Sequence, residues 1–285
     1  MKKLFVITGQ TATGKTKLAL QYAKKINGEL INADSKQIYK HLDIITGKDL
    51  DEIDSVPTHL YSIIDPKKHF SSHEWAKLAS QKIANVERKG KTSIIVGGTY
   101  QYISHLLYGV ETEGVKPDWL LRKKLKNKST QFLQKLLKNI SPQVLKQMNQ
   151  SDRNNPRRLL RKIEIASSPH LSGTLEAKPL LKQFDVEIIG LHLSNRERFE
   201  QTIRRRVEKR LKQGAVEELK SLLKKGYKLT DPGLQANACK EIYRYLEKKI
   251  TKEELIQRWV TIEMQYAKRQ YTFMKKDKNI KWREV

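Results

Sequence analysis

An eight-residue glycine-rich segment near the start of the chain carries the clearest chemical pattern in the sequence. It matches the phosphate-binding pattern G-x-x-x-x-G-K-[ST] at every fixed position. In such a loop the backbone N–H groups and the start of the next helix bind phosphate oxygens, the lysine neutralises the terminal phosphate, and the last hydroxyl binds Mg²⁺. We therefore predict a di- or triphosphate site, with Thr16 as the Mg²⁺ ligand, formed by Gly9, Gln10, Thr11, Ala12, Thr13, Gly14, Lys15 and Thr16.

The acidic residue expected beside such a loop stands in an unusual place. P-loop hydrolases hold Mg²⁺ with an acid at the end of a neighbouring apolar strand, but the best such strand here, residues 92–96, ends in a glycine pair and Thr99. Two glycines and a hydroxyl favour close approach to a substrate and one hydrogen bond to it. Asp34 instead follows the strand expected at residues 29–33, where it would face the same crevice as the phosphate loop. Asp34 could also cap a following helix.

Other polar residues give weaker signals. Gln37 and Tyr39 follow Asp34 closely; a glutamine can recognise an adenine edge through two hydrogen bonds, although both residues could equally be packing residues. The seven histidines show no metal-ligand spacing, and the single cysteine, Cys239, excludes an intramolecular disulfide and a thiolate metal cage. Mg²⁺ at the phosphate loop is thus the one cofactor that the sequence predicts.

Strands and helices alternate around these residues. Short apolar runs rich in β-branched residues predict buried parallel strands at residues 4–8, 29–33, 59–64 and 92–96. Helices are predicted at residues 17–26, at residues 71–88, where Ser71 and Glu74 form a capping box, and from the glycine pair to Tyr108. This alternation predicts an α/β fold: a P-loop NTPase-like parallel sheet flanked by helices.

The composition and residue pattern of the sequence change after Gly109. Residues 117–165 are almost all helix formers, dense in Lys and Arg, and a strand pattern returns only at residues 185–193. The simplest account is an all-helical insertion domain between two strands of one sheet. We therefore predict a catalytic core of residues 1–112 and 184–285, with mainly helical C-terminal residues and a last short strand at 280–283, and an insertion of residues 113–183.

The charge of the chain points to a polyanionic partner. Lys and Arg outnumber Asp and Glu by 57 to 31, a formal net charge of +26. Nucleic acid is the partner this excess favours, ahead of an anionic membrane or solubility alone, although a lysine-rich composition would also place many lysines on helix faces. No apolar run has the length of a membrane span, and the first is too short for a signal peptide. We expect a soluble, cytoplasmic protein without membrane contacts.

Beyond the phosphate loop, an ordered series of segments covering nearly the whole chain resembles the tRNA isopentenyl- or dimethylallyltransferases of bacteria and organelles. The most specific segments are residues 31–39 (INADSKQIY) and 266–270 (YAKRQ). The chain departs from the family's usual residues at Ile45, Thr58, Tyr100, Gln101 and Cys239. These departures leave the phosphate loop, Asp34 and Thr99 intact, so they concern tRNA contacts and efficiency more than the chemistry.

The resemblance implies a reaction and a role for several residues. Dimethylallyl diphosphate would be the donor, and N6 of adenine 37 of tRNA would attack it with release of pyrophosphate. The catalytic residues would be Asp34 as the general base, Thr99 as a hydrogen-bond donor near the bridging oxygen, and Arg206, which with Lys15 and Mg²⁺ would stabilise the leaving group. Arg206 could alternatively be a solvated residue of a basic helix, because other arginines surround it.

The resemblance also implies how tRNA is bound. The target base would be extruded from the anticodon stem-loop, since chemistry on a stacked base requires flipping, and the helical insertion would grip the tRNA backbone. We expect a monomer. The residues expected to contact tRNA are Asp34, Ser35, Lys36, Gln37, Arg157, Arg158, Arg161, Lys268, Arg269 and Gln270.

Two other enzyme classes with the same core stay open. A P-loop nucleotide kinase would carry an arginine-bearing lid over the phosphates, and the insertion could be mistaken for one. An isopentenyltransferase acting on free AMP would have little need of a basic insertion. A non-enzymatic RNA-binding protein would explain the charge, but not an intact Lys15–Thr16 pair together with Asp34.

Overall fold

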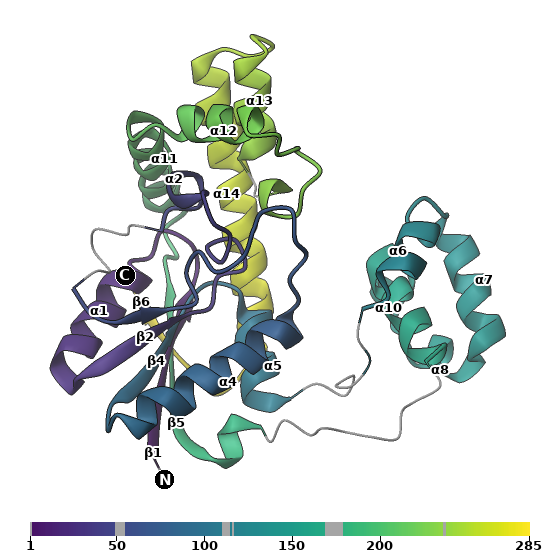
Figure 1. Ribbon diagram of the computed structural model, residues 1–285, viewed down its shortest axis with the longest axis horizontal. Coiled ribbons are helices and arrows are strands. Elements are labelled where there is room, and N and C mark those ends of the chain that lie inside the picture. Colours follow the sequence, from purple (N-terminus) through teal and green to yellow (C-terminus); the bar gives the residue numbers. More distant parts are fainter. Residues whose placement is uncertain (1, 49–54, 110–114, 116, 169–178, 236–237) are drawn as a thin grey trace. The chain divides into compact units, whose positions relative to one another are not determined.

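The computed structural model describes residues 2–48, 55–109, 115, 117–168, 179–235 and 238–285 (Figure 1). The chain divides into two compact units, Met1–Tyr108 with Pro179–Val285, and Gly109–Lys178. The boundaries expected from the sequence, 112/113 and 183/184, lie a few residues further along the chain.

The first unit is built on one parallel sheet. Every adjacent pair of named strands is parallel, and the strand order is β3-β2-β4-β1-β5-β6. The predicted α/β fold class is confirmed. The strands are β1 (Lys2–Gly9), β2 (Gly28–Asn32), β3 (Thr58–His59), β4 (Thr92–Val96), β5 (Phe184–His192) and β6 (Ile280–Glu284).

Helices cover both faces of this sheet (Figure 1). Alternate residues of β1 face opposite sides: Phe5 and Ile7 pack against α1, whereas Leu4 and Val6 belong to the larger core on the other face. Burial on both faces explains why these strands are continuously apolar. The helices of the first unit are α1 (Lys15–Ile26), α2 (Asp43–Thr46), α4 (Ser72–Arg88), α5 (Tyr100–Tyr108), α11 (Arg196–Lys212), α12 (Ala215–Lys224), α13 (Cys239–Leu246) and α14 (Lys252–Met274), with 3₁₀ turns η1 (Leu180–Lys182) and η2 (Gly233–Gln235).

Local signals set several of these boundaries. The predicted capping box at the start of α4 is present, with the Ser71 side chain accepting from the backbone N–H of Glu74 and the Glu74 carboxylate accepting from that of Ser71. Thr251 and Glu254 form a second capping box at α14. Capping therefore fixes where two of the longer helices begin.

The strand predicted at residues 59–64 is wrong over most of its length. β3 ends at His59, and Leu60 and Ser62 have φ values of +65° and +50°, which no strand residue adopts. The backbone instead follows the segment after Asp34, and the N–H of Ser62 donates to the carbonyl of Gln37 over 3.1 Å. His59 itself is structural, because its Nε2 lies 2.7 Å from the buried carboxylate of Glu29.

The second unit is entirely helical over its described residues. It has its own apolar core, and the nearly buried Glu164 accepts hydrogen bonds from the side chains of Arg122 and Arg161. Its helices are α6 (Trp119–Leu125), α7 (Thr130–Ile140), α8 (Pro142–Gln147), α9 (Gln150–Arg153) and α10 (Pro156–Ala166). In neither unit does a described helix combine the length and apolar character needed to cross a bilayer.

Candidate active site

The phosphate loop joins β1 to α1 at the carboxyl edge of the sheet. Gly9 has φ +137°, and a Cβ there would lie 2.1 Å from the Leu191 carbonyl oxygen, so only glycine fits between β1 and β5. Gly14 has φ +79° and precedes the first residue of α1. The Lys15 ammonium donates to the Gln10 carbonyl over 2.5 Å, so the loop closes on its own lysine.

The electrostatic setting of Lys15 favours an anion. Burial, and to a smaller extent the positive charge of Arg206, lower the pKa of Lys15 to about 7, against weaker opposing effects of Asp34 and Glu263. A bound diphosphate would supply the negative charge that keeps the ammonium protonated. The loop therefore has the chemistry of a phosphate site.

Binding of Mg²⁺-pyrophosphate is expected to be coupled to protonation of Lys15. The free protein holds this group with a pKa of about 7, and a diphosphate raises that pKa, so at about pH 7.5–8 binding should take up a fraction of a proton, and affinity should fall as pH rises. Titration calorimetry in buffers of different ionisation enthalpy measures the uptake. Lys15→Met is the control for protons taken up by pyrophosphate itself. Equal uptake by both proteins would contradict the assignment.

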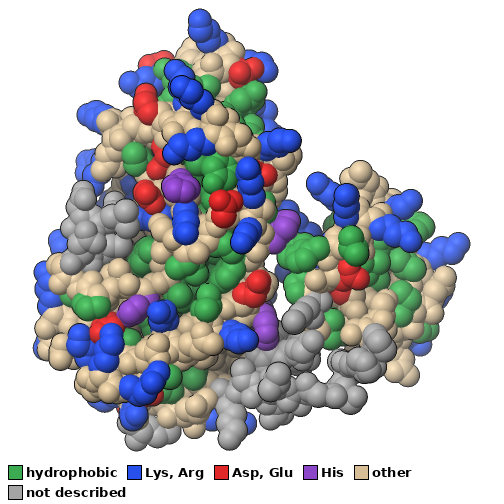
Figure 2. Space-filling view, in the orientation of Figure 1, with side chains coloured by type: hydrophobic (Ala, Val, Ile, Leu, Met, Phe, Trp, Pro, Cys, Tyr) green, Lys and Arg blue, Asp and Glu red, His purple; other side chains and the backbone are tan. Residues whose placement is uncertain are grey.

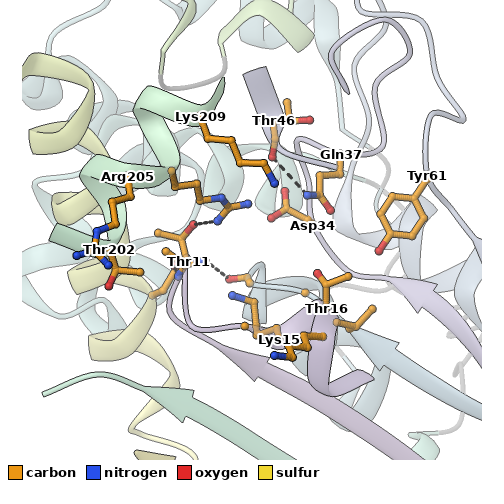
Figure 3. Close-up of a pocket in the computed structure, with 18 residues that line it drawn as sticks. Thr11, Lys15, Thr16, Asp34, Gln37, Thr46, Tyr61, Thr202, Arg205 and Lys209 are labelled. Atoms are coloured by element: carbon orange, nitrogen blue, oxygen red, sulfur yellow. Dashed lines mark hydrogen bonds between the residues drawn. The ribbon is translucent and has the colours of Figure 1, made fainter. Parts of the chain in front are cut away.

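A pocket of about 360 Å³ opens in front of the loop (Figure 3). This volume is typical of small-molecule sites, about 300–1,000 Å³. Lys15 and Asp34 both point into it, from the start of α1 and from the segment after β2 (Figure 3). Of the residues predicted for the site, those lining the pocket are Thr11, Ala12, Gly14, Lys15, Thr16, Asp34, Gln37, Arg206 and Gln270.

Asp34 caps a turn and not a helix. Its Oδ1 accepts from the backbone N–H of Lys36 over 2.8 Å, and residues 35–38 form turns. The alternative role of capping a following helix therefore does not hold, because the chain bends back here to pair with residues 62–64. No hydrogen bond reaches Oδ2 from any residue that the structure describes. That oxygen is available to a ligand in the pocket.

The glycine pair after β4 allows other parts of the protein to approach closely. A Cβ on Gly97 would lie 2.3 Å from the backbone carbon of Ala33, and a Cβ on Gly98 would lie 2.1 Å from Nε2 of Gln270. The prediction that the pair serves close approach to a substrate is thus incomplete, although both residues also line the pocket. The Thr99 hydroxyl accepts from the Ser35 N–H at 3.0 Å and is absent from the pocket lining.

The arginines of the basic helix α11 have different partners. Arg206 is half-buried, and its guanidinium donates to the Thr11 hydroxyl at 3.1 Å and to the Gly47 carbonyl at 3.4 Å. Arg204 donates to Gln257, and the buried Arg210 pairs with Glu263 at 3.3 Å. Arg206 is therefore directed at the phosphate loop, and the alternative of a purely solvated side chain does not hold.

Known proteins resemble this chain over nearly its full length. The family model described as IPP transferase matches residues 37–277.

The chain belongs to the IPP transferase family.

Relatives and solved structures agree with this assignment. A tRNA dimethylallyltransferase of Caldanaerobacter subterraneus is 35% identical over 98% of this chain and 91% of that protein, and one of Aquifex aeolicus is 36% identical over 99% and 92%. The tRNA isopentenylpyrophosphate transferase of Bacillus halodurans superposes with a TM-score of 0.72 at 32% identity, covering all of this chain and 90% of that one. A eukaryotic dimethylallyltransferase acting on tRNA gives 0.80 at 27%, covering all of this chain and 74% of that one. The resemblance predicted from the sequence is confirmed.

Two residues that hold this family member's pocket together were given no role from the sequence. The Glu218 carboxylate accepts from three consecutive backbone N–H groups at the start of α2, over 2.7–2.9 Å. Burial raises the pKa of Glu218, against the effect of these three bonds. The buried Lys48 donates to the Tyr39 carbonyl and to the side chains of Asp43 and Ser62.

This bracing reaches the pocket through Gln37. Its amide nitrogen donates to the carbonyls of Thr46 and Gly47, at 3.3 and 2.8 Å, at the end of the braced helix α2. The amide is thus oriented before any ligand binds. A short helix of four residues has no periodicity to detect, so the sequence pattern does not reveal this bracing.

The residues predicted to contact tRNA lie in both units. In the second unit, Arg157 is exposed, Arg158 pairs with Asp152, and Arg161 donates to Glu164 and to the Val115 carbonyl. In the first unit, Lys268 and Arg269 are exposed on α14. Ser35 and Lys36 donate their backbone N–H groups to Thr99 and Asp34. The exposed members of the set are therefore Arg157, Arg158, Lys268 and Arg269.

Proposed function

We propose that this chain transfers a dimethylallyl group from dimethylallyl diphosphate to N6 of adenine 37 of tRNA, releasing pyrophosphate. The observation that supports this most directly is the pocket itself. A phosphate loop with Lys15 and a carboxylate, Asp34, face each other across it, and no acid ends the neighbouring strand β4. A prenyl diphosphate needs this combination: charge for the leaving group, and a base for the attacking amine.

The pocket residues divide the reaction between them. Lys15 and Arg206 bind the diphosphate and stabilise the charge that grows on it as the bond between C1 and the bridging oxygen breaks. The adenine N6 forms a bond to C1, and Asp34 accepts the N6 proton through the oxygen that is not engaged in its turn. The Thr99 hydroxyl holds Ser35 next to Asp34. The same hydroxyl would form a hydrogen bond near the bridging oxygen of the donor.

Mg²⁺ fits this pocket as a partner of the diphosphate. Mg²⁺ prefers oxygen ligands, retains several waters and is commonly bound through substrate phosphates. The described residues contain no cluster of three or more His, Cys, Asp or Glu side chains that could hold a metal ion, so the ion would be held by the Thr16 hydroxyl and the diphosphate oxygens. When bound, it neutralises phosphate charge. The chain's own residues, Lys15 and Arg206, act on the same oxygens.

The charge of the chain supports tRNA as the acceptor. Figure 2 shows Lys and Arg side chains spread over the visible face of each unit, with fewer acidic ones between them. Such a surface binds the phosphate backbone and contributes affinity more than sequence choice. We propose that the Gly109–Lys178 unit binds the anticodon stem-loop, that the enzyme acts as a monomer in the cytoplasm, and that Arg157, Lys268 and Arg269 are among the contacts.

The donor is expected to be dimethylallyl diphosphate and not ATP. Incubation of the protein with Mg²⁺, dimethylallyl diphosphate and unmodified tRNA, followed by mass analysis of the nucleosides, should show an adenosine heavier by one dimethylallyl group. Replacing the donor with ATP should give neither phosphorylated nucleoside nor ADP. Turnover of ATP on a nucleoside acceptor would instead make the chain a kinase, and prenylation of free AMP in preference to tRNA would give the other enzyme class.

A further inference from the structure

Gln270 connects the two halves of the pocket. It lies on α14, is only 7% exposed, and belongs to the segment whose resemblance suggested a contact with tRNA. Its Oε1 accepts from the backbone N–H of Thr11 over 2.8 Å, and its Nε2 donates to the Gly98 carbonyl over 2.9 Å. One side chain thus joins the phosphate loop to the segment that follows β4.

We propose that Gln270 is a positioning residue, which sets the spacing between the phosphate loop and the segment that carries Asp34. The inference rests on the proposed function for its chemical meaning. It does not require Gln270 to touch donor, acceptor or the reacting atoms.

The Gly98 side of this connection continues directly to Asp34. The residue after Gly98 is Thr99, whose N–H donates to the Ala33 carbonyl at 3.1 Å and whose hydroxyl accepts from Ser35 at 3.0 Å. Ala33 and Ser35 are the chain neighbours of Asp34. A displacement of the Gly98 carbonyl is therefore transmitted to both sides of the carboxylate.

The Thr11 side of the connection reaches the groups that bind phosphate. Thr11 lies within the loop, and its hydroxyl accepts from Arg206 at 3.1 Å. Gln270 accepts the hydrogen bond of the Thr11 backbone N–H. Without this bond, the peptide group of Thr11 could rotate. The amide thereby fixes both the loop and a residue that orients Arg206.

The space around Gly98 agrees with this role of Gln270. Gly98 does not have a positive φ, so its backbone would accept an L residue. A Cβ there would meet Nε2 of Gln270 at 2.1 Å, whereas the next contacts, Cδ of the same side chain at 3.3 Å and the Gly9 carbonyl at 3.6 Å, are much longer. A side chain at position 98 would therefore displace the Gln270 amide from its place.

Spacing across this pocket matters for rate more than for binding. Transfer needs the attacking nitrogen, C1 and the leaving oxygen in near-attack geometry, and a displacement of about 1 Å can cost about 10²-fold in rate. If Gln270 instead contacted tRNA directly, its replacement would weaken tRNA binding and leave kcat at saturating tRNA unchanged. The two roles therefore separate in kcat against tRNA affinity.

The test is a double-mutant cycle between positions 98 and 270. Gln270→Ala and Gly98→Ala should each lower kcat at saturating substrates, by up to about 10²-fold, with tRNA affinity unchanged within about twofold. The double variant Gly98→Ala/Gln270→Ala should be no slower than Gln270→Ala, because the methyl group added at position 98 then has room. Gln265→Met, a change of an exposed glutamine on the same helix, is the matched control and should behave as wild type.

Affinity for Mg²⁺-pyrophosphate provides a readout that does not depend on transfer. Loss of the two hydrogen bonds of Gln270 should weaken this affinity by about tenfold, and the double variant should again lose no more than Gln270→Ala alone. The proposal would be overturned if the losses of the two single variants multiplied in the double variant. A loss confined to tRNA affinity would also overturn it. If the wild type transfers nothing, the proposed function fails, and the pyrophosphate cycle still decides the role of Gln270.

Discussion

Replacing Asp34 with asparagine should lower kcat for dimethylallyl transfer by roughly 10²–10⁴-fold, the usual contribution of a positioned base. Asparagine has nearly the same shape and keeps an oxygen that can accept from the Lys36 N–H, so the turn after β2 should survive. Only the ability to take a proton is lost. Single-turnover rates at saturating donor and tRNA measure the effect, and unchanged affinities for Mg²⁺-pyrophosphate and tRNA are the control.

Thr99→Val is the companion variant. It removes the hydroxyl that accepts from Ser35 while keeping a β-branched side chain, and it should cost about 1.5–3 kcal/mol in the transition state if the hydroxyl also serves the charged leaving group. Near-normal transfer by Asp34→Asn together with an inactive Thr99→Val would show that the proton leaves to water or to the departing pyrophosphate. Asp34 would then be a turn cap alone.

Deleting the Gly109–Lys178 unit should abolish measurable tRNA binding while leaving Mg²⁺-pyrophosphate affinity within about threefold. The unit has its own apolar core, separate from that of the sheet, and with 6–10 phosphate contacts the intact protein should lose about 10³–10⁵-fold in tRNA affinity between 50 and 200 mM salt. Because α5 packs against η1, a short Gly-Ser linker can join Tyr108 to Pro179. Filter binding across salt concentrations measures the first effect, and calorimetry the second.

A milder variant guards against misfolding of the truncated protein. Arg157→Glu changes an exposed residue of α10 whose side chain packs in no core; it should weaken tRNA binding and reduce the salt slope by about one to two. If the truncated protein binds pyrophosphate normally and tRNA as tightly as the intact chain, the assignment of this unit is wrong.

The parts of the fold that the sequence predicts well are those with local causes. β4 has the bounds expected because a continuous apolar run between polar residues defines a buried strand without reference to the rest of the chain. The phosphate loop is equally local, because the positive φ of Gly9 and Gly14 is a requirement of the loop's own backbone. The capping box of α4 involves residues only three positions apart.

What the sequence does not predict depends on distant partners. Residues 60–64 have the composition of a strand, yet they bend because their partners are the turn residues after Asp34 and the ammonium of Lys48. Glu218 resembles any glutamate on an amphipathic helix until α2, more than 170 positions earlier, supplies three N–H groups. The side chain that lies against Gly98 is on α14, 172 positions away.

The order of strands has a consequence for synthesis of the chain. β1, which leads into the phosphate loop, pairs with β4 on one side and with β5 on the other, and β5 begins only at Phe184, after the helical unit. On the ribosome, one edge of the central strand must therefore stay unpaired while some seventy residues of the helical unit, Gly109–Lys178, emerge. That unit can bury its own apolar residues before β5 has been synthesised. The phosphate loop, in contrast, depends on a later residue. Its Thr11 N–H can donate to Gln270 only after α14 has been synthesised.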